Sequence, residues 1–149
     1  MTKIYRLVRA DRAEDAFSGE GARLYGGRWN PPGTAVVYAS ESRALAVLET
    51  FVHLTLEART MRFLLYTVTL PPRLRLQRYR GQSAPRSLAA SQEAGRKWIA
   101  EGQALGLVVP SVLVGQERNY VLNVRHRQFA RLEIGRPEPF SFDERLWRR

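Results

Sequence analysis

The chain has 149 residues, of which 44% are hydrophobic and 10% aromatic, and this length and composition predict one globular domain over residues 1–149. The absence of cysteine excludes disulfides, thiolate metal sites and a cysteine nucleophile, and two histidines argue against a histidine-based metal cluster, so no metal site is expected. The formal net charge of +10 favours an anionic substrate or partner, but the basic residues are spread along the chain without a helix-turn-helix or zinc pattern, so direct nucleic-acid binding is not expected.

The amino-terminal part predicts a strand that leads into a glycine-rich loop. Residues 4–8 alternate as a strand, with Arg6 on the face opposite Tyr5. Residues 11–17 predict a short helix. The loop over residues 18–33 contains five glycines and a Pro-Pro pair, a composition that allows positive φ angles and close approach of the backbone. We interpret this loop as shaped for a ligand.

A short strand and a helix follow the loop. Residues 36–39 read as a buried strand, and residues 40–42 supply N-cap candidates for an apolar-rich helix that extends to about residue 56. With about 100° per residue along a helix, Glu49 lies at the border between an apolar face and a polar strip. A carboxylate in that position can be half-buried and still reach a ligand.

The second half of the chain predicts several strands and one more helix. Residues 73–90 are polar and basic and predict an exposed loop, and residues 91–104 predict a helix with Trp98 and Ile99 as core anchors. Pro110 interrupts an apolar run, which implies an edge or a bulge that lifts Ser111 out of the pleat. The expected strands cover residues 61–70, 107–109, 112–114, 119–123, 129–134 and 140–142. Together the elements favour an α+β fold with two main helices and a strongly bent, largely antiparallel sheet pair.

The candidate site residues have structural alternatives that spacing alone leaves open. Glu49 is equally an ordinary boundary glutamate in contact with solvent. Arg28 fits a surface arginine paired with a neighbouring acid as well as a fork of donors for a phosphate group. Tyr38 fits a core aromatic residue.

The sequence SGEGARLYGGRWNPPG, followed by VVYASES and ALAVLETFVHL, resembles the RES domain, the toxin of bacterial toxin–antitoxin pairs, which is named for an arginine, a glutamate and a serine. The resemblance continues through VVPSVLVGQERNYVLNVRH and PFSFDERL. It departs at residues 73–90, which lack a tryptophan-containing segment typical of many relatives. The resemblance implies an ADP-ribosyltransferase-like core.

Carried over by position, the resemblance implies a catalytic group made of Glu49, Arg28 and Tyr38. Glu49 would stabilise the oxocarbenium-like transition state, and Tyr38 would stack on nicotinamide. Arg28, together with Arg6, would bind the pyrophosphate or the nicotinamide ribose side. The family's serine would be Ser111, hydrogen-bonding near the substrate. The other residues implied on the substrate side are Gly27, Asn119, Asn123 and His126.

The activity implied by the resemblance is degradation of NAD⁺ at the nicotinamide–ribose bond, with water or inorganic phosphate as acceptor and no prosthetic group. Some relatives instead transfer ADP-ribose to a protein. The implied partner is an Xre-like helix-turn-helix antitoxin that occludes the active site, and a homodimer within that complex is compatible with the family. An alternative function of a different class is that of a non-catalytic nucleic-acid-binding module that uses residues 73–86.

The sequence carries no targeting or membrane signal. The amino end, MTKIYRLVRADRAED, turns polar and charged before any long apolar run. No stretch approaches the roughly 20 apolar residues that span a bilayer. We therefore expect a cytoplasmic protein that does not associate with membranes.

Overall fold

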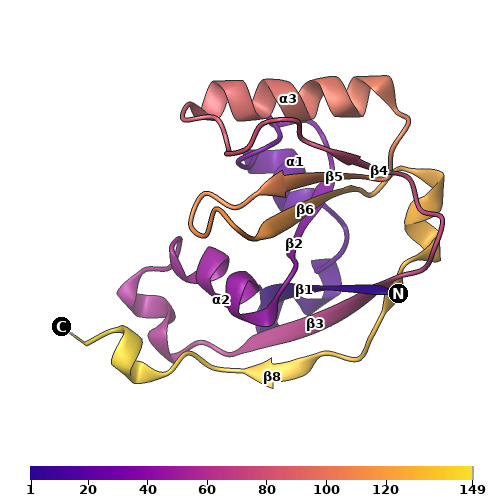
Figure 1. The fold of residues 1–149 in the computed structure, drawn as a ribbon. Helices are drawn as coiled ribbons and strands as arrows, with labels where there is room; N and C mark the ends of the chain where they lie inside the picture. Colours follow the sequence, from indigo (N-terminus) through magenta and orange to yellow (C-terminus); the bar gives the residue numbers. More distant parts are fainter. Residues whose placement is uncertain (149) are drawn as a thin grey trace.

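The computed structural model describes residues 1–148, which form one hydrogen-bonded sheet with helices packed around it (Figure 1). The strand order is β4-β5-β6-β2-β1-β3-β7, and β8 also pairs with β3. The strands are β1 (Thr2–Arg9), β2 (Val36–Ser40), β3 (Phe63–Leu70), β4 (Leu76–Arg78), β5 (Gly106–Pro110), β6 (Arg118–Asn123), β7 (Glu133–Ile134) and β8 (Glu138–Phe140). The α-helices are α1 (Glu20–Tyr25), α2 (Arg43–Phe51) and α3 (Leu88–Glu101).

The sheet is bent because its two halves are joined at one point. Strands β1 and β2 share only the pair Tyr5↔Ser40. On either side of this junction, β1 pairs with β3 along its whole length and β2 pairs with β6 along its whole length. The halves therefore splay apart, with α3, β4, β5 and β6 in the upper part of Figure 1 and β1, β3 and β8 in the lower part. Within residues 1–148, β4 and β5 are the only strands that pair in parallel.

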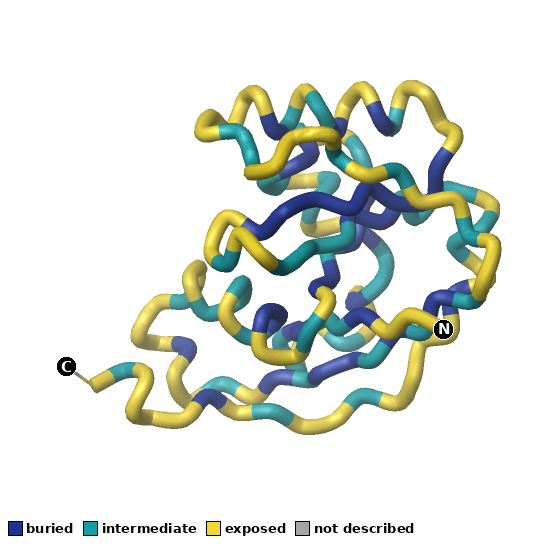
Figure 2. The backbone as a smooth tube through the Cα atoms, in the orientation of Figure 1, coloured by how far each residue is buried: buried dark blue, intermediate teal, exposed yellow. Residues whose placement is uncertain are grey.

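The apolar core follows these halves. Figure 2 shows the buried backbone concentrated along the central strands. One cluster joins Ile4 and Val68 to Leu122 across the junction, and a second places Trp98 of α3 against Val121 of β6. Trp98 also donates its indole N–H to the carbonyl of Ala104 at 3.1 Å, which satisfies its one polar atom. The expected anchoring role of Trp98 is confirmed, as is the α+β class with a bent, mainly antiparallel sheet.

Two helices differ from the sequence expectation. The glycine-rich segment contains α1, which the glycines concealed. Helix α2 ends at Phe51 and not near residue 56, because Leu54 turns inward to pack with Phe63, and residues 56–60 then form a 3₁₀ turn.

The segment expected as an exposed loop contains the edge strand β4. Its pairing with β5 is extended by the amide of Tyr79, which donates to the carbonyl of Val108 at 2.9 Å. Helix α3 then starts at Leu88, three residues earlier than expected, because the hydroxyl of Ser87 accepts a hydrogen bond from the amide of Ala90.

Two expected strands are turns. Residues 112–114 do not resume a strand after Pro110, because the amides of Leu113 and Val114 donate to the Ser111 hydroxyl. Residues 127–131 form a 3₁₀ turn, and only Glu133–Ile134 of the expected strand over 129–134 pairs with β3. Within the described residues, no helix is long and apolar enough to cross a bilayer.

Candidate active site

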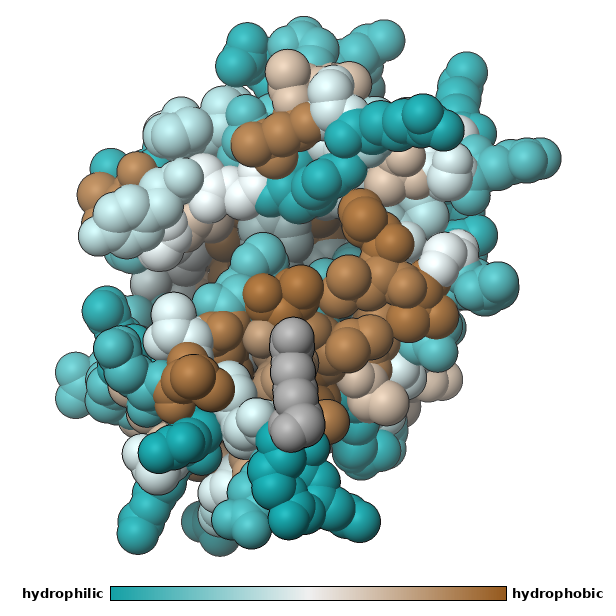
Figure 3. Space-filling view, turned by 90° about the vertical axis from the view of Figure 1, so that its left-hand side faces the viewer, coloured by the Kyte–Doolittle hydropathy of each residue, from teal (hydrophilic) through white to brown (hydrophobic). Residues whose placement is uncertain are grey.

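A cavity of about 980 Å³ lies between the two halves of the sheet. Its walls come from β1, β2, α1, α2 and the loop between α1 and β2, and Figure 3 shows the hollow from outside. This volume is at the upper end of what small-molecule sites enclose, which is roughly 300–1,000 Å³. Arg6, Gly27, Arg28, Tyr38, Glu49 and Asn119 all line it.

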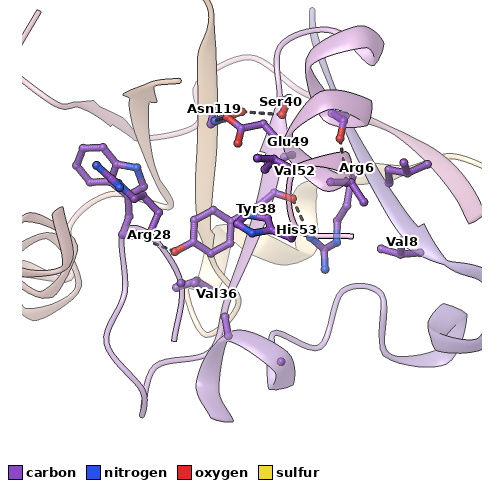
Figure 4. Close-up of a pocket in the computed structure, with 18 of the residues that line it drawn as sticks. Arg6, Val8, Arg28, Val36, Tyr38, Ser40, Glu49, Val52, His53 and Asn119 are labelled. Atoms are coloured by element: carbon purple, nitrogen blue, oxygen red, sulfur yellow. Dashed lines mark hydrogen bonds between the residues drawn. The ribbon is translucent and has the colours of Figure 1, made fainter. Parts of the chain in front are cut away.

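Glu49 projects from α2 into this cavity with its two carboxylate oxygens in different environments (Figure 4). Oε2 accepts hydrogen bonds from the amide Nδ2 of Asn119 at 2.5 Å and from the hydroxyl of Ser111 at 2.8 Å. Oε1 has no hydrogen-bond partner among residues 1–148. Glu49 is therefore not an ordinary solvated boundary residue: one oxygen is fixed, and the other is available to a ligand.

Ser111 supports Glu49 without lining the cavity. Its side chain is buried, accepts from the amides of Leu113 and Val114, and donates its one proton to Glu49. The structure thus places the Ser111 hydroxyl on the carboxylate of Glu49, beside the cavity.

Asn119 lines the cavity beside Glu49, and a neighbouring strand fixes its orientation. Its Oδ1 accepts from the hydroxyl of Ser40 at 2.6 Å, which turns its Nδ2 toward Glu49. Ser40 and Asn119 face each other in the β2–β6 register. Sequence reasoning missed Ser40 as a site residue, although its place at the end of a buried strand was a usable signal.

Arg6 lies under the cavity on β1, held by two backbone carbonyls. Its Nε donates to the carbonyl of Ala16 at 2.7 Å and its Nη1 to that of Tyr38 at 2.9 Å. Burial lowers the pKa of Arg6 to about 10, so the guanidinium remains charged at neutral pH. The face of the guanidinium also lies 5.9 Å from the ring centroid of Phe17.

Arg28 lies at the opposite wall of the cavity from Arg6 in Figure 4. Its Nη2 donates to the carbonyl of Pro85 at 2.5 Å, and its Nε is buried without a hydrogen-bond partner in residues 1–148. Gly27 before it has no room for a side chain, because an added Cβ would lie 2.7 Å from the hydroxyl of Tyr38. Arg28 therefore does not pair with an acidic side chain, and one of its donors remains unused.

Tyr38 connects β2 to the Arg28 loop. Its hydroxyl accepts from the amide of Trp29 at 3.0 Å and donates to Oδ1 of Asn30 at 2.6 Å, and burial raises its pKa. Asn30 is buried and donates in turn to the carbonyls of Ala22 and Pro31. Tyr38 is thus both a wall of the cavity and the support of the loop that carries Arg28.

We expect Tyr38→Phe to lower the free energy of unfolding by about 1–3 kcal/mol, because the buried Asn30 carbonyl oxygen and the Trp29 amide each lose their partner. Urea unfolding followed by tryptophan fluorescence measures this. Tyr120→Phe is the matched control, since the Tyr120 hydroxyl has no hydrogen bond within the described chain and its removal leaves nothing unpaired. Equal midpoints for the two variants would contradict the supporting role of Tyr38.

Asn123 and His126 do not line the cavity, so the structure does not bring them together with the other candidate site residues. The Asn123 side chain accepts from the amide of Arg125 at 3.0 Å. Nδ1 of His126 accepts from the amide of Gln128, so its Nε2 is the protonated nitrogen, 3.1 Å from the carbonyl of Gln103. Both side chains close turns after β6.

No group of three or more acidic or histidine side chains within residues 1–148 is arranged to hold a metal ion. The site consists instead of one half-buried carboxylate and a set of guanidinium groups. His53 of the segment after α2 and Arg12 also line the cavity, and sequence reasoning named neither as a site residue.

The fold and site together define an α+β protein whose splayed sheet encloses a cavity with a carboxylate on one helix and arginines on facing elements. A solved structure with this architecture, titled "Crystal structure of the M.tuberculosis MbcT-MbcA toxin-antitoxin complex", matches with a TM-score of 0.76 and 21% identity, over 94% of this chain and 84% of that chain. The family model described as "RES domain" matches residues 3–143, and the chain belongs to this family.

Two curated relatives match over nearly their whole length, and a third matches over a short segment. "Toxin Res" from Yersinia enterocolitica is 36% identical, with 96% of this chain and 98% of the relative covered. "Prs ADP-ribosylating toxin" from a Sphingobium species is 31% identical, with 99% and 98% covered. A segment of 46 residues, 30% of this chain and 24% of the relative, is 48% identical to "NAD(+) phosphorylase MbcT" from Mycobacterium tuberculosis.

Proposed function

We propose that this protein is the toxin of a toxin–antitoxin pair and that it consumes NAD⁺ by breaking the nicotinamide–ribose bond. The observation that carries the proposal is the pair of unequal oxygens on Glu49, one fixed by Ser111 and Asn119 and one facing a cavity lined by arginines. The names of the relatives, which include a toxin, an ADP-ribosylating toxin and an NAD⁺ phosphorylase, support the same chemistry.

The reaction requires a negatively charged carboxylate near the ribose, and it does not require a general acid to protonate the leaving group. As the C–N bond to nicotinamide breaks, positive charge develops on the ribose, and nicotinamide leaves as a neutral molecule with the bonding electron pair. Oε1 of Glu49 accepts a hydrogen bond from a ribose hydroxyl and stabilises that charge, because it lies in a partly desolvated cavity. The oxygen of the acceptor then bonds to the anomeric carbon and loses its proton to solvent.

The arginines bind the other half of the substrate. Arg28 and the buried, charged Arg6 line the cavity from opposite walls, so their guanidinium groups suit the pyrophosphate of a dinucleotide. The ring of Tyr38 lies between them and takes the nicotinamide. The backbone of Gly27 lets the substrate approach the loop closely.

Each possible acceptor gives a different product, so the products identify the acceptor. Purified chain incubated with NAD⁺ is expected to release nicotinamide, detected by chromatography. Water as acceptor gives ADP-ribose, inorganic phosphate gives ADP-ribose 1″-phosphate, and a protein acceptor gives labelled protein in a lysate supplied with labelled NAD⁺. If nicotinamide is released under none of these conditions, the proposed function is contradicted.

NAD⁺ is a cytoplasmic cofactor, and we propose that the toxin acts in the cytoplasm.

The mouth of the cavity has an apolar rim that suits an antitoxin. The rim consists of five residues that are exposed and line the cavity: Val52 after α2, Val112 and Leu113 after β5, Leu88 of α3 and Tyr25 of α1. Apolar side chains border the hollow in Figure 3. Exposed apolar patches of this kind mark protein interaction sites. We propose an Xre-like antitoxin that covers this rim and blocks the cavity.

Val112→Asp is expected to weaken the complex with the antitoxin encoded beside this protein by about 10- to 100-fold, because a carboxylate would be buried at the centre of the rim. Isothermal titration calorimetry of the purified partners measures the affinity, and the mass of the complex reports whether the toxin is present once or as a homodimer. The matched control is Ile134→Asp on β7, which is also exposed and apolar but lies away from the cavity. Equal losses for both variants would contradict the rim as the binding site.

A further inference from the structure

Three contacts join the loop that carries Arg28 to the segment between β4 and the middle of α3. On one side of Arg28, the carbonyl of Gly27 accepts from Nε2 of Gln92 at 3.0 Å. Arg28 itself donates from Nη2 to the carbonyl of Pro85. On the other side, the ring of Trp29 meets the ring of Tyr79 edge-on, with centroids 5.0 Å apart. The three consecutive loop residues are thus each held by this later segment.

The backbone of α3 lies directly on the loop. A Cβ added to Gly95 would lie 1.5 Å from the carbonyl oxygen of Trp29, so glycine is the only residue that lets the helix and loop touch. Glycine inside a helix costs about 1 kcal/mol relative to alanine. This glycine lies where α3 meets the Arg28 loop, which indicates that close contact between the helix and the loop is required.

The contact of the Arg28 loop with the segment between β4 and the middle of α3 determines where the guanidinium of Arg28 faces. One end of the guanidinium is fixed by Pro85, and Nε is buried without a partner in the described chain. Among residues 1–148, the guanidinium makes only the Nη2 hydrogen bond, and Arg28 lines the cavity, so its other N–H groups are available to an anionic ligand there. The carbonyl of Gly27 fixes the backbone from which the arginine side chain starts, so Gln92 controls its orientation from outside the cavity.

We propose that Gln92 is a positioning residue for Arg28: its amide holds the Gly27 carbonyl so that the arginine presents its guanidinium to the pyrophosphate of the substrate. The role as a pyrophosphate ligand rests on the proposed function, whereas the orientation of Arg28 does not. Gln92 is half-buried and is not among the residues that line the cavity, so it acts through Gly27 and Arg28 and not on the substrate.

The test compares Gln92→Met, which keeps the length of the side chain and removes the amide donor, with Glu93→Met one residue along, where the side chain is exposed. The first measurement is hydrogen exchange of the Arg28 Nε–H by ¹⁵N nuclear magnetic resonance, with the signal assigned by its loss in Arg28→Lys. Loss of one hydrogen bond corresponds to about 0.5–1.5 kcal/mol, so exchange in Gln92→Met is expected to be about 3- to 10-fold faster than in the wild type. Glu93→Met is expected to match the wild type.

The second measurement is the kinetics of NAD⁺ consumption. Gln92→Met is expected to raise KM about 3- to 10-fold with kcat changed less than about twofold, because only binding of the pyrophosphate is affected. An unchanged exchange rate of the Arg28 Nε–H in Gln92→Met overturns the positioning role. If the wild-type chain consumes no NAD⁺, the proposed function fails, and the exchange rate still decides whether Gln92 orients Arg28.

Discussion

Glu49→Gln is expected to lower kcat for nicotinamide release by about 10²–10³-fold, because a neutral amide does not stabilise the positive charge that develops on the ribose. The substitution preserves the local packing. The amide oxygen of the new side chain accepts from Ser111 and Asn119 as Oε2 does now, which leaves its NH₂ group facing the cavity. The change therefore replaces an acceptor by a donor at the one position that faces the substrate.

Initial rates of nicotinamide release measure this effect, and thermal unfolding checks that the variant is folded. Glu101→Gln is the matched control, since this glutamate is exposed at the end of α3 and does not line the cavity. We expect it to retain the wild-type rate. A folded Glu49→Gln variant with a rate within about threefold of the wild type would show that the carboxylate is not the group that stabilises the transition state.

The second large effect is expected on stability. Gly95→Ala is expected to lower the free energy of unfolding by more than about 3 kcal/mol, or to prevent folding, because its methyl group would overlap the carbonyl of Trp29. Backbone atoms lie on both sides of this contact, so no side-chain rotation relieves it. For a chain of this size, such a loss lowers Tm by roughly 6–12 °C.

Differential scanning calorimetry of Gly95→Ala and Gly21→Ala separates this contact from a general effect of alanine in a helix. Gly21 also lies in a helix, α1, and a Cβ there meets nothing within 4 Å. Gly21→Ala is expected to be neutral or to raise stability by about 0.5–1 kcal/mol, since alanine favours the helix. Equal stability of Gly95→Ala and the wild type would contradict the close packing of α3 on the Arg28 loop.

Local patterns of the sequence were sufficient for much of the fold. Strands β1, β2, β3 and β6 carry alternating or continuous apolar residues, and the structure has a strand at each of these places. Strand β4 escaped detection because arginines occupy most of its surroundings, and an edge strand of three residues needs no apolar run. Helix α1 was not predicted because it contains a glycine and has glycines on both sides, and glycine has a low helix propensity. Propensity is a weak guide to helix formation where tertiary contacts stabilise the helix.

The sequence pointed to several of the residues that line the cavity, but not to the hydrogen bonds between them. The helical period placed Glu49 at a polar border, and the family pattern pointed to Ser111 and Asn119. No local pattern revealed that both side chains donate to the same oxygen of Glu49, because these partners are 62 and 70 residues away in the chain. The supports of the Arg28 loop, Asn30 and Gln92, depend likewise on tertiary contacts and gave no periodic signal.

The crystal structure of Glu49→Gln with NAD⁺ bound tests the central claim most directly, because this variant is expected to bind the dinucleotide without cleaving it. The account predicts the nicotinamide ribose within hydrogen-bonding distance of the side chain at position 49 and a phosphate oxygen on the guanidinium of Arg28. NAD⁺ bound on another face of the protein, or bound in the cavity with its nicotinamide ribose out of reach of position 49, would contradict it.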